Sequence, residues 1–279
     1  MRHIGHSTSV SLTYPQDLTL LQLLKPLLSS RKPTRTVRQA GELPLAPDQP
    51  VYAIGDIHGR DDLVEPLLIK IDADITERGI EAPQLVFLGD YVDRGDQSAG
   101  VLEHLYKLTQ DLPDVVTCLM GNHEKMMLEF LDDPAGRGAR WLANGGLQTL
   151  ASYNIGGLST RASIEDMAEA SDALAEALPV GMEAWLRALP LIWQSGNVVC
   201  VHAAMNPSKP PEDQDERGLI WGHRDFLQMS RPDDLWVVHG HTTVDMPLAA
   251  DSRISIDTGA WHSDRLTAAA ITAGECRFL

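Results

Sequence analysis

From residue 51 the chain reads Val51-Tyr52-Ala53-Ile54-Gly55-Asp56-Ile57-His58-Gly59, a short apolar run that ends in a polar turn bracketed by glycines. An apolar run of about four residues with β-branched and aromatic side chains favours a buried strand over a helix. Further runs of this kind predict strands at 85–88, 115–120, 198–201 and 236–238. Helical stretches are expected between the first three strands, at 61–70 and 98–109. This β-α-β-α-β opening predicts an α/β fold.

The size and charge of the chain limit the classes of protein to which it can belong. Its 279 residues allow one large α/β domain or two smaller ones. The formal net charge of -16 disfavours nucleic acids and anionic membranes as partners, because both select for Lys and Arg. The apolar stretch Leu18–Leu24 is too short to span a membrane, and basic residues follow it instead of preceding it as in a signal peptide. We therefore expect a cytoplasmic protein with no nucleic-acid and no membrane partner.

Residues 1–47 differ in composition from the rest of the chain. Between Lys25 and Arg38 there are five basic side chains and no acidic one. We interpret this segment as a basic N-terminal extension or linker, either a solvated tail or a docking segment for a partner or an acidic substrate. Residues 48–279 are expected to form the main domain. A helical insertion is predicted within it at about 157–190, where Ala, Glu and Leu are frequent.

The first polar block places Asp56 and His58 directly after the first predicted strand. Residues two apart in extended backbone project to the same side, so the two side chains can hold one ion. A carboxylate oxygen and an imidazole nitrogen suit Mn, Fe or Zn better than Ca, which prefers oxygen ligands alone. Taken alone, the pair is weak evidence for a metal site, and a solvated turn is the favoured interpretation.

The second block, Gly89-Asp90-Tyr91-Val92-Asp93-Arg94-Gly95, follows the second predicted strand. The carboxylate of Asp90 can bridge two cations, which two-metal hydrolases hold about 3.5 to 4 Å apart. The planar guanidinium of Arg94 matches two phosphate oxygens at once. A surface ion pair with Asp93 or Asp96 is the alternative role for this arginine.

The remaining candidate residues lie at later strand ends. Asn122 can ligate a metal through its amide oxygen, and His123 is left free for proton transfer beside the site. His202 and His241 follow the strands at 198–201 and 236–238. Five strand ends thus supply six candidate metal ligands, which are Asp56, His58, Asp90, Asn122, His202 and His241. The sequence therefore predicts a two-metal site outside the carboxyl ends of the strands.

The three blocks Gly-Asp-x-His-Gly, Gly-Asp-x-Val-Asp-Arg-Gly and Gly-Asn-His-Glu resemble the signature of the PPP family of metal-dependent phosphoprotein phosphatases. Later segments resemble bacterial and phage-type members, namely Leu219-Ile220-Trp221 with Arg224, Gly240-His241-Thr242 and Ile256-Asp257-Thr258-Gly259-Ala260. The similarity extends from about Val51 to the C-terminus. It implies a calcineurin-like metallophosphoesterase fold, with a central β-sandwich flanked by helices.

The resemblance also implies a role for each candidate residue. One metal would be held by Asp56, His58 and Asp90, and the other by Asp90, Asn122, His202 and His241. His123 would be the general acid, with Asp93 as its carboxylate partner. Arg94 and Arg224 would bind the phosphoryl oxygens, although bacterial relatives often place the second arginine one residue earlier, which makes His223 a rival for that role.

The function implied is that of a metal-dependent phosphomonoester hydrolase, specifically a serine/threonine protein phosphatase acting on phosphorylated proteins or peptides. A hydroxide that bridges two divalent metal ions would attack phosphorus directly, and manganese is the expected metal, with iron or zinc as alternatives. Two other functions stay open. One is a bis(5'-nucleosyl) tetraphosphate hydrolase, whose family usually departs from the second block. The other is a non-catalytic scaffold that binds phosphorylated partners.

Overall fold

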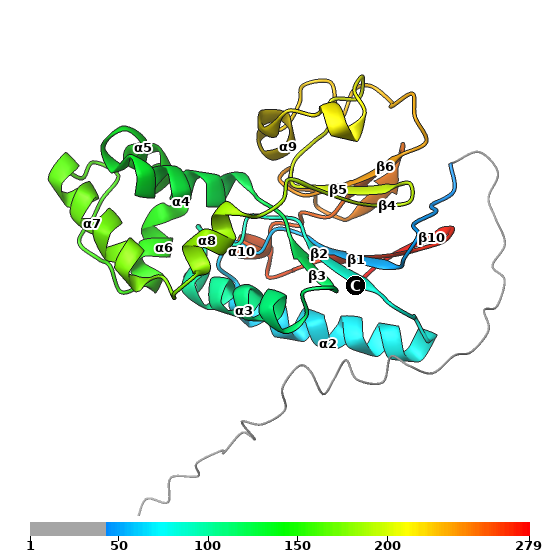
Figure 1. Ribbon diagram of the computed structural model, residues 1–279, viewed down its shortest axis with the longest axis horizontal. Helices are drawn as coiled ribbons and strands as arrows, with labels where there is room; N and C mark the ends of the chain where they lie inside the picture. Colours follow the sequence, from blue (N-terminus) through cyan, green and yellow to red (C-terminus); the bar gives the residue numbers. More distant parts are fainter. Residues whose placement is uncertain (1–42) are drawn as a thin grey trace, which may run out of the picture.

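The computed structural model describes residues 43–279, which form two five-stranded mixed sheets packed face to face (Figure 1). The first sheet has the strand order β10-β9-β1-β2-β3, with strands β1 (Val51–Ile54), β2 (Gln84–Phe87), β3 (Val116–Cys118), β9 (Ala268–Thr272) and β10 (Glu275–Phe278). The second has the order β4-β5-β6-β8-β7, with strands β4 (Ile192–Ser195), β5 (Val198–Val201), β6 (Trp236–His239), β7 (Leu248–Ala250) and β8 (Arg253–Ser255).

Helices flank this sandwich on its outer side and at one end. Helices α2 (Asp61–Arg78) and α3 (Ser98–Asp111) lie along the first sheet (Figure 1). A helical lobe follows β3 and contains α4 (Asn122–Asp132), α5 (Pro134–Trp141), a π-helical turn (Leu142–Gly146), α6 (Leu147–Ser152), α7 (Ile164–Ala177) and α8 (Met182–Arg187). The short helices near the second sheet and the C-terminus are a 3-10 turn (Pro211–Asp213), α9 (Glu216–Trp221) and α10 (Ala260–Ser263).

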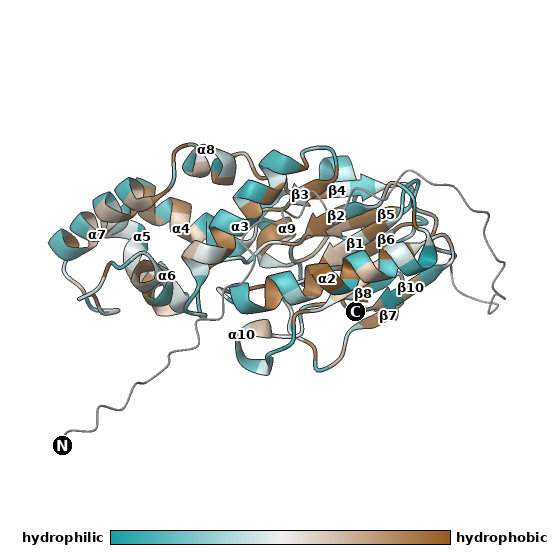
Figure 2. Cartoon of the chain, turned by 90° about the horizontal axis from the view of Figure 1, so that it is seen from below, coloured by the Kyte–Doolittle hydropathy of each residue, from teal (hydrophilic) through white to brown (hydrophobic). Residues whose placement is uncertain are grey.

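The alternation of side chains along β1 explains why the sheets and helices pack as layers. Val51 and Ala53 face the core between the two sheets, whereas Tyr52 and Ile54 face the core beneath the helices. All four side chains are buried, so β1 reads as a continuous apolar run and not as an alternating one. Figure 2 shows the same distribution, with hydrophobic residues concentrated on the strands and on one side of the helices.

The predicted α/β fold and the five predicted strands are confirmed, with shifts of one or two residues at some ends. The strands β1, β2 and β3 are parallel neighbours joined by α2 and α3, as the opening pattern indicated. Five further strands were not predicted. The strands β7 and β8 have only three residues each, and β9 begins Ala268-Ala269-Ala270, a composition with low β-propensity.

The predicted division of the chain at residue 47 stays a prediction, because residues 1–42 lie outside the described residues. The described part of the N-terminal segment packs on the main domain. Leu45 is buried in the core between the sheets, and the Trp236 indole donates a hydrogen bond to the Leu43 carbonyl at 2.9 Å. Helices α7 and α8 fall within the predicted insertion at 157–190, although the helical lobe already begins at Asn122.

Between residues 43 and 279, no helix combines the length and the apolar character that crossing a bilayer requires.

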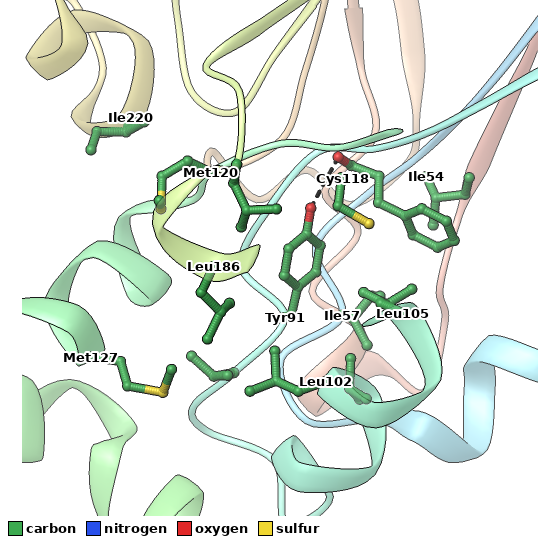
Figure 3. Packing of buried hydrophobic residues seen from close by; sticks show 14 of the residues in the cluster. Ile54, Ile57, Tyr91, Leu102, Leu105, Cys118, Met120, Met127, Leu186 and Ile220 are labelled. Carbon is green, nitrogen blue, oxygen red and sulfur yellow. Dashed lines mark hydrogen bonds between the residues drawn. The ribbon is translucent and has the colours of Figure 1, made fainter. Parts of the chain in front are cut away.

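The loop that follows β2 is anchored from below by a buried tyrosine. The Tyr91 hydroxyl donates to the carbonyl of Leu119 at 2.7 Å and lies 3.2 Å from that of Phe87. Figure 3 shows the ring standing among Ile57, Leu102 and Leu105 with its hydroxyl pointing toward the strands. These contacts of Tyr91 hold the loop that carries Asp90 against the ends of β2 and β3.

Candidate active site

The six predicted metal ligands converge at the carboxyl ends of five strands. Asp56 and His58 follow β1, Asp90 follows β2, Asn122 begins α4 after β3, His202 follows β5 and His241 follows β6. Among residues 43–279, two groups of metal-type side chains have ligand atoms within 4.8 Å of one another. These groups are His58, Asp90 and His123, and Asp90, His202 and His241. Asp90 belongs to both groups.

The ring of His58 is oriented by a backbone carbonyl. Its Nδ1 lies 2.8 Å from the Val92 carbonyl oxygen, which can only accept, so Nδ1 carries the proton. Burial lowers the pKa of His58 to about 3, so the ring is neutral and Nε2 presents a lone pair. That lone pair faces Asp90 Oδ2 at 3.4 Å. Two acceptors facing each other in a buried site are stable only with a cation between them.

The second group repeats this arrangement. His202 Nδ1 lies 2.9 Å from the Leu88 carbonyl oxygen, which leaves Nε2 as an acceptor, and burial lowers the pKa of His202. Nε2 faces Asp90 Oδ1 at 3.3 Å and Asn122 Oδ1 at 3.0 Å. His241 Nδ1 lies 2.8 Å from the same amide oxygen, and burial lowers the pKa of His241 to about 4. The acceptor atoms His202 Nε2, Asp90 Oδ1 and Asn122 Oδ1 therefore point into one space.

Asp56 provides an independent sign that the site takes cations. Its Oδ2 accepts a hydrogen bond from the His241 backbone N–H at 3.0 Å, but its buried Oδ1 has no hydrogen-bond partner within residues 43–279. Burial raises the pKa of Asp56 well above its ordinary range, and the nearby carboxylates of Asp257 and Asp90 raise it further. A divalent cation at Oδ1 would satisfy this oxygen. The donor set of carboxylate, imidazole and amide groups therefore fits a pair of divalent metal ions.

The backbone at the site adopts conformations that are rare for residues with a side chain. Five predicted site residues have positive φ, namely His58 (48°), Asp90 (54°), Asp93 (72°), Arg94 (70°) and His241 (60°). Each such residue costs of order 1 kcal/mol or more and persists only where the surroundings enforce it. The concentration of these conformations marks the strand-end loops as a constrained functional region.

Glu124 enforces the conformation of the Asp90 loop. Its buried carboxylate accepts the backbone N–H groups of Asp90 (2.8 Å), Tyr91 (2.7 Å) and Val92 (3.2 Å). It also accepts the Gly121 N–H at 3.1 Å, and so caps α4. The first turn of α4 and the loop of the shared carboxylate are thereby held as one unit.

His123 forms a buried pair with Asp93 beside the metal-type groups. Its Nδ1 lies 2.6 Å from Asp93 Oδ2, and its Nε2 lies 3.2 Å from an Arg94 guanidinium nitrogen and 3.9 Å from Asp90 Oδ2. Burial alone would lower the pKa of His123, but the carboxylates of Asp90 and Asp93 outweigh burial and raise it. The pair has the geometry of an acid and its orienting carboxylate.

Arg224 is the predicted site residue that the structure does not bring to the others. Its side chain is 89% exposed, and its ion pair within residues 43–279 is with Asp225 at 3.5 Å. The rival His223 accepts the Asp225 backbone N–H through Nδ1 at 3.3 Å. The turn after α9 points the arginine into solvent, so its contact with a phosphate stays a prediction.

Two residues that sequence reasoning missed contact the Asp93 carboxylate. These residues are Trp141 at the end of α5 and Thr149 in α6. The signal available in the sequence was Trp141-Leu142-Ala143-Asn144-Gly145-Gly146, where two adjacent glycines interrupt a helical pattern. The segment lies in helices, away from the strand ends at which the sequence pattern predicts chemistry.

The sandwich fold and its strand-end cluster of carboxylates and imidazoles define a metallophosphoesterase. The model of the calcineurin-like phosphoesterase family matches residues 49–268, and the chain belongs to this family. It is therefore a hydrolytic enzyme acting on phosphate esters.

A curated relative and two solved structures resemble the chain. The asymmetrical bis(5'-nucleosyl)-tetraphosphatase PrpE of Oceanobacillus iheyensis is 28% identical over 235 residues, which are 77% of this chain and 86% of the relative. A structure provisionally described as a diadenosine tetraphosphatase has a TM-score of 0.57 at 22% identity, with 83% of this chain and 93% of that chain covered. A protein serine/threonine phosphatase from Saccharomyces cerevisiae has a TM-score of 0.50 at 17% identity, with 84% and 80% covered. The two structural likenesses show the shared fold alone.

Proposed function

We propose that the chain is a serine/threonine protein phosphatase of the PPP type, which hydrolyses phosphomonoesters in proteins or peptides. The Asp93–His123 pair is the observation that carries this proposal. The alkoxide of serine or threonine is a poor leaving group that departs with a proton, whereas a phosphoanhydride leaving group departs as a stable anion. His123 is buried, has a raised pKa and lies beside Arg94, so it can supply the proton that a serine or threonine leaving group needs.

The proposed metal centre uses the ligands assigned from the sequence, with manganese as the expected metal. Asp56, His58 and Asp90 would hold one ion, and Asp90, Asn122, His202 and His241 the other. Bound there, the two ions would lower the pKa of a water molecule and neutralise phosphoryl oxygens. His123 lies close enough to complete the first group, but its two ring nitrogens face Asp93 and Arg94. The positive guanidinium disfavours a cation at that position.

The contact between Arg94 and His123 supports a sequence of events that starts with phosphate binding. Arginine can only donate, so His123 Nε2 accepts from Arg94 and the neutral ring donates its Nδ1 proton to Asp93. A phosphoryl oxygen that takes over the Arg94 guanidinium frees Nε2 to take up a proton from solvent water, which is favoured because the neighbouring carboxylates raise the pKa of His123. His123 can then deliver this proton to the departing alkoxide. Substrate binding thereby prepares the acid.

A second candidate function is an asymmetrical bis(5'-nucleosyl)-tetraphosphatase. The observation that favours it is the 28% identity to PrpE over 86% of that relative's length. A non-catalytic scaffold is not favoured, because all six predicted metal ligands are present and converge. For either candidate the cytoplasm is the proposed compartment, supported by three free cysteines within the described residues.

The deciding experiment compares substrates under one metal. The manganese-loaded protein is assayed with phosphoserine, phosphothreonine and phosphotyrosine peptides and with diadenosine tetraphosphate, and kcat/KM is measured for each. We expect the phosphoserine or phosphothreonine peptides to be preferred. A preference for the dinucleotide by orders of magnitude would replace the first candidate with the second.

A variant tests the role of His123. His123→Asn is assayed with phenyl phosphate and with 4-nitrophenyl phosphate, which differ in how much their leaving group needs a proton. We expect kcat to fall at least about 100-fold on phenyl phosphate and much less on 4-nitrophenyl phosphate. Equal losses on the two substrates would contradict the assignment of His123 as the acid.

A further inference from the structure

The helical segment 141–149 reaches over the loop that carries Asp93 and Arg94. It comprises the last residue of α5, the π-helical turn and the start of α6. Residues 142–146 are not regular helix, because Gly145 has a φ of 111° and kinks the chain between the two helices. Here the turn brings side chains from two successive helices to the same carboxylate. The function proposed above gives this segment no role.

The contacts of the segment converge on Asp93. The Trp141 indole N–H lies 3.0 Å from both carboxylate oxygens, and the Thr149 hydroxyl donates to Oδ1 at 2.6 Å. Thr149 Oγ1 also accepts the Asp93 backbone N–H at 2.9 Å. With His123 on Oδ2 at 2.6 Å, both carboxylate oxygens are occupied by donors. The carboxylate cannot rotate without breaking several hydrogen bonds at once.

A third contact extends the segment to Arg94. The Gly145 carbonyl accepts the Arg94 backbone N–H at 3.4 Å. Gly145 has a φ of 111°, and a Cβ at this position would lie 2.6 Å from the Arg94 nitrogen. Only glycine allows the π-helical turn to lie this close to the loop. The same segment thus fixes the backbone of both neighbouring site residues.

We propose that Trp141 and Thr149 are positioning residues for the acid, which act through Asp93 to set the orientation of the His123 ring. The proposal rests on the proposed function, because it takes His123 as the proton donor. In this arrangement Oδ2 is directed at His123 Nδ1 because Thr149 holds Oδ1 and Trp141 holds the plane of the carboxylate. The segment 141–149 therefore contributes to proton transfer although it supplies no metal ligand.

A purely structural role for these residues must be separated from positioning. Trp141 is fully buried and packs against Phe130 with ring centroids 4.7 Å apart, so its replacement also disturbs the core. Thr149 offers a cleaner change, because valine keeps its shape and removes only the hydroxyl. Thr149→Ser keeps the hydroxyl and is the matched rescue. Trp185→Phe, in α8 against Tyr106, is the matched control for Trp141→Phe.

The experiment measures kcat of each manganese-loaded variant on phenyl phosphate and on 4-nitrophenyl phosphate. The ratio of the two rates is independent of the fraction of folded protein. We expect Thr149→Val and Trp141→Phe to lower kcat about tenfold on phenyl phosphate, equivalent to about 1.4 kcal/mol, and by less than about twofold on 4-nitrophenyl phosphate. Thr149→Ser and Trp185→Phe should keep the wild-type ratio. In the His123→Asn background, Thr149→Val should leave the ratio unchanged.

Two outcomes overturn the proposal, and they are distinguishable from each other. If His123→Asn changes the ratio but Thr149→Val and Trp141→Phe do not, the positioning role is wrong and the proposed function stands. If His123→Asn itself lowers both rates equally, the proposed function fails and the positioning role fails with it. Equal losses on both substrates for Thr149→Val would assign that residue to structural support alone.

Discussion

Gly240 precedes His241 and lies against the unpaired oxygen of Asp56, so the substitution Gly240→Ala tests the metal site by shape alone. A Cβ at this position would lie 1.9 Å from Asp56 Oδ1. Real Cβ contacts are essentially never shorter than 3.0 Å, so the carboxylate must retreat by at least about 1 Å. Gly240 is absent from the residues with positive φ, so alanine brings no backbone strain of that kind.

A shift of about 1 Å in a ligand is enough to be measured. Changes that disturb the orientation of a metal ligand typically cost about 10- to 100-fold in affinity or activity. We therefore expect the manganese concentration that gives half-maximal activity to rise at least about tenfold in Gly240→Ala. Isothermal titration calorimetry with Mn²⁺ measures the affinity directly, and thermal unfolding in the presence of a chelator reports the stability of the metal-free fold.

Gly156→Ala is the matched control, because a Cβ there would have no heavy atom of the described residues within 4 Å. It should leave both manganese affinity and turnover unchanged. An unchanged manganese requirement in a folded Gly240→Ala protein would refute the reasoning, since it would mean that Asp56 Oδ1 does not face a metal. If chelator-treated Gly240→Ala is unfolded whereas chelator-treated wild-type protein is folded, the alanine disturbs the fold before any metal binds.

Three other predictions follow from the geometry. Arg94→Ala should lower kcat/KM about 10- to 100-fold, because a charge-assisted contact to phosphate is lost. Arg224→Ala should change kcat/KM less than about threefold, because that side chain is 89% exposed. A larger effect of Arg224→Ala would show that the turn after α9 moves onto the substrate. Treatment with a chelator should abolish activity and lower the midpoint of thermal unfolding, because the buried carboxylates lose their counter-charge. Added Mn²⁺ should restore both. Activity that survives complete metal removal would contradict the metal centre. Burial raises the pKa of the Cys276 thiol to about 12, so the thiol is almost entirely protonated at pH 8. It should therefore react with iodoacetamide at least about 100-fold more slowly than in the unfolded protein, and the rate should rise only as the pH approaches 12. Fast alkylation of Cys276 at pH 8, located by mass spectrometry, would show that the C-terminal strand opens.

The strand-end residues could be predicted from the sequence because their position follows from a local rule. Asp56, Asp90 and His202 each follow an apolar run. Parallel strands bring Asp56 and Asp90 to one edge of the first sheet, and His202 follows a strand of the second sheet, which packs against the first. Their side chains meet although they lie far apart in the chain. The roles that the resemblance gives to these residues remain proposals.

The contacts that depend on tertiary packing could not be predicted in this way. Trp141 and Thr149 reach Asp93 only because a π-helical turn changes the direction of the chain between two helices. No periodicity in the sequence encodes that turn. The strand β9 was missed for a different reason, since its alanine-rich sequence becomes a strand only through pairing with β1 and β10. In both cases long-range contacts decide the outcome.

The two histidine hydrogen bonds to backbone carbonyls have a consequence for metal loading. The accepting carbonyls belong to Leu88 and Val92, which bracket Asp90 in one loop. That loop would thus supply the carboxylate common to the two proposed ions, and it selects the nitrogen that each imidazole presents. An ion that enters either half stabilises the loop conformation that the other half requires. The two binding events are therefore linked, and uptake of the metal pair should be cooperative instead of proceeding as two independent steps.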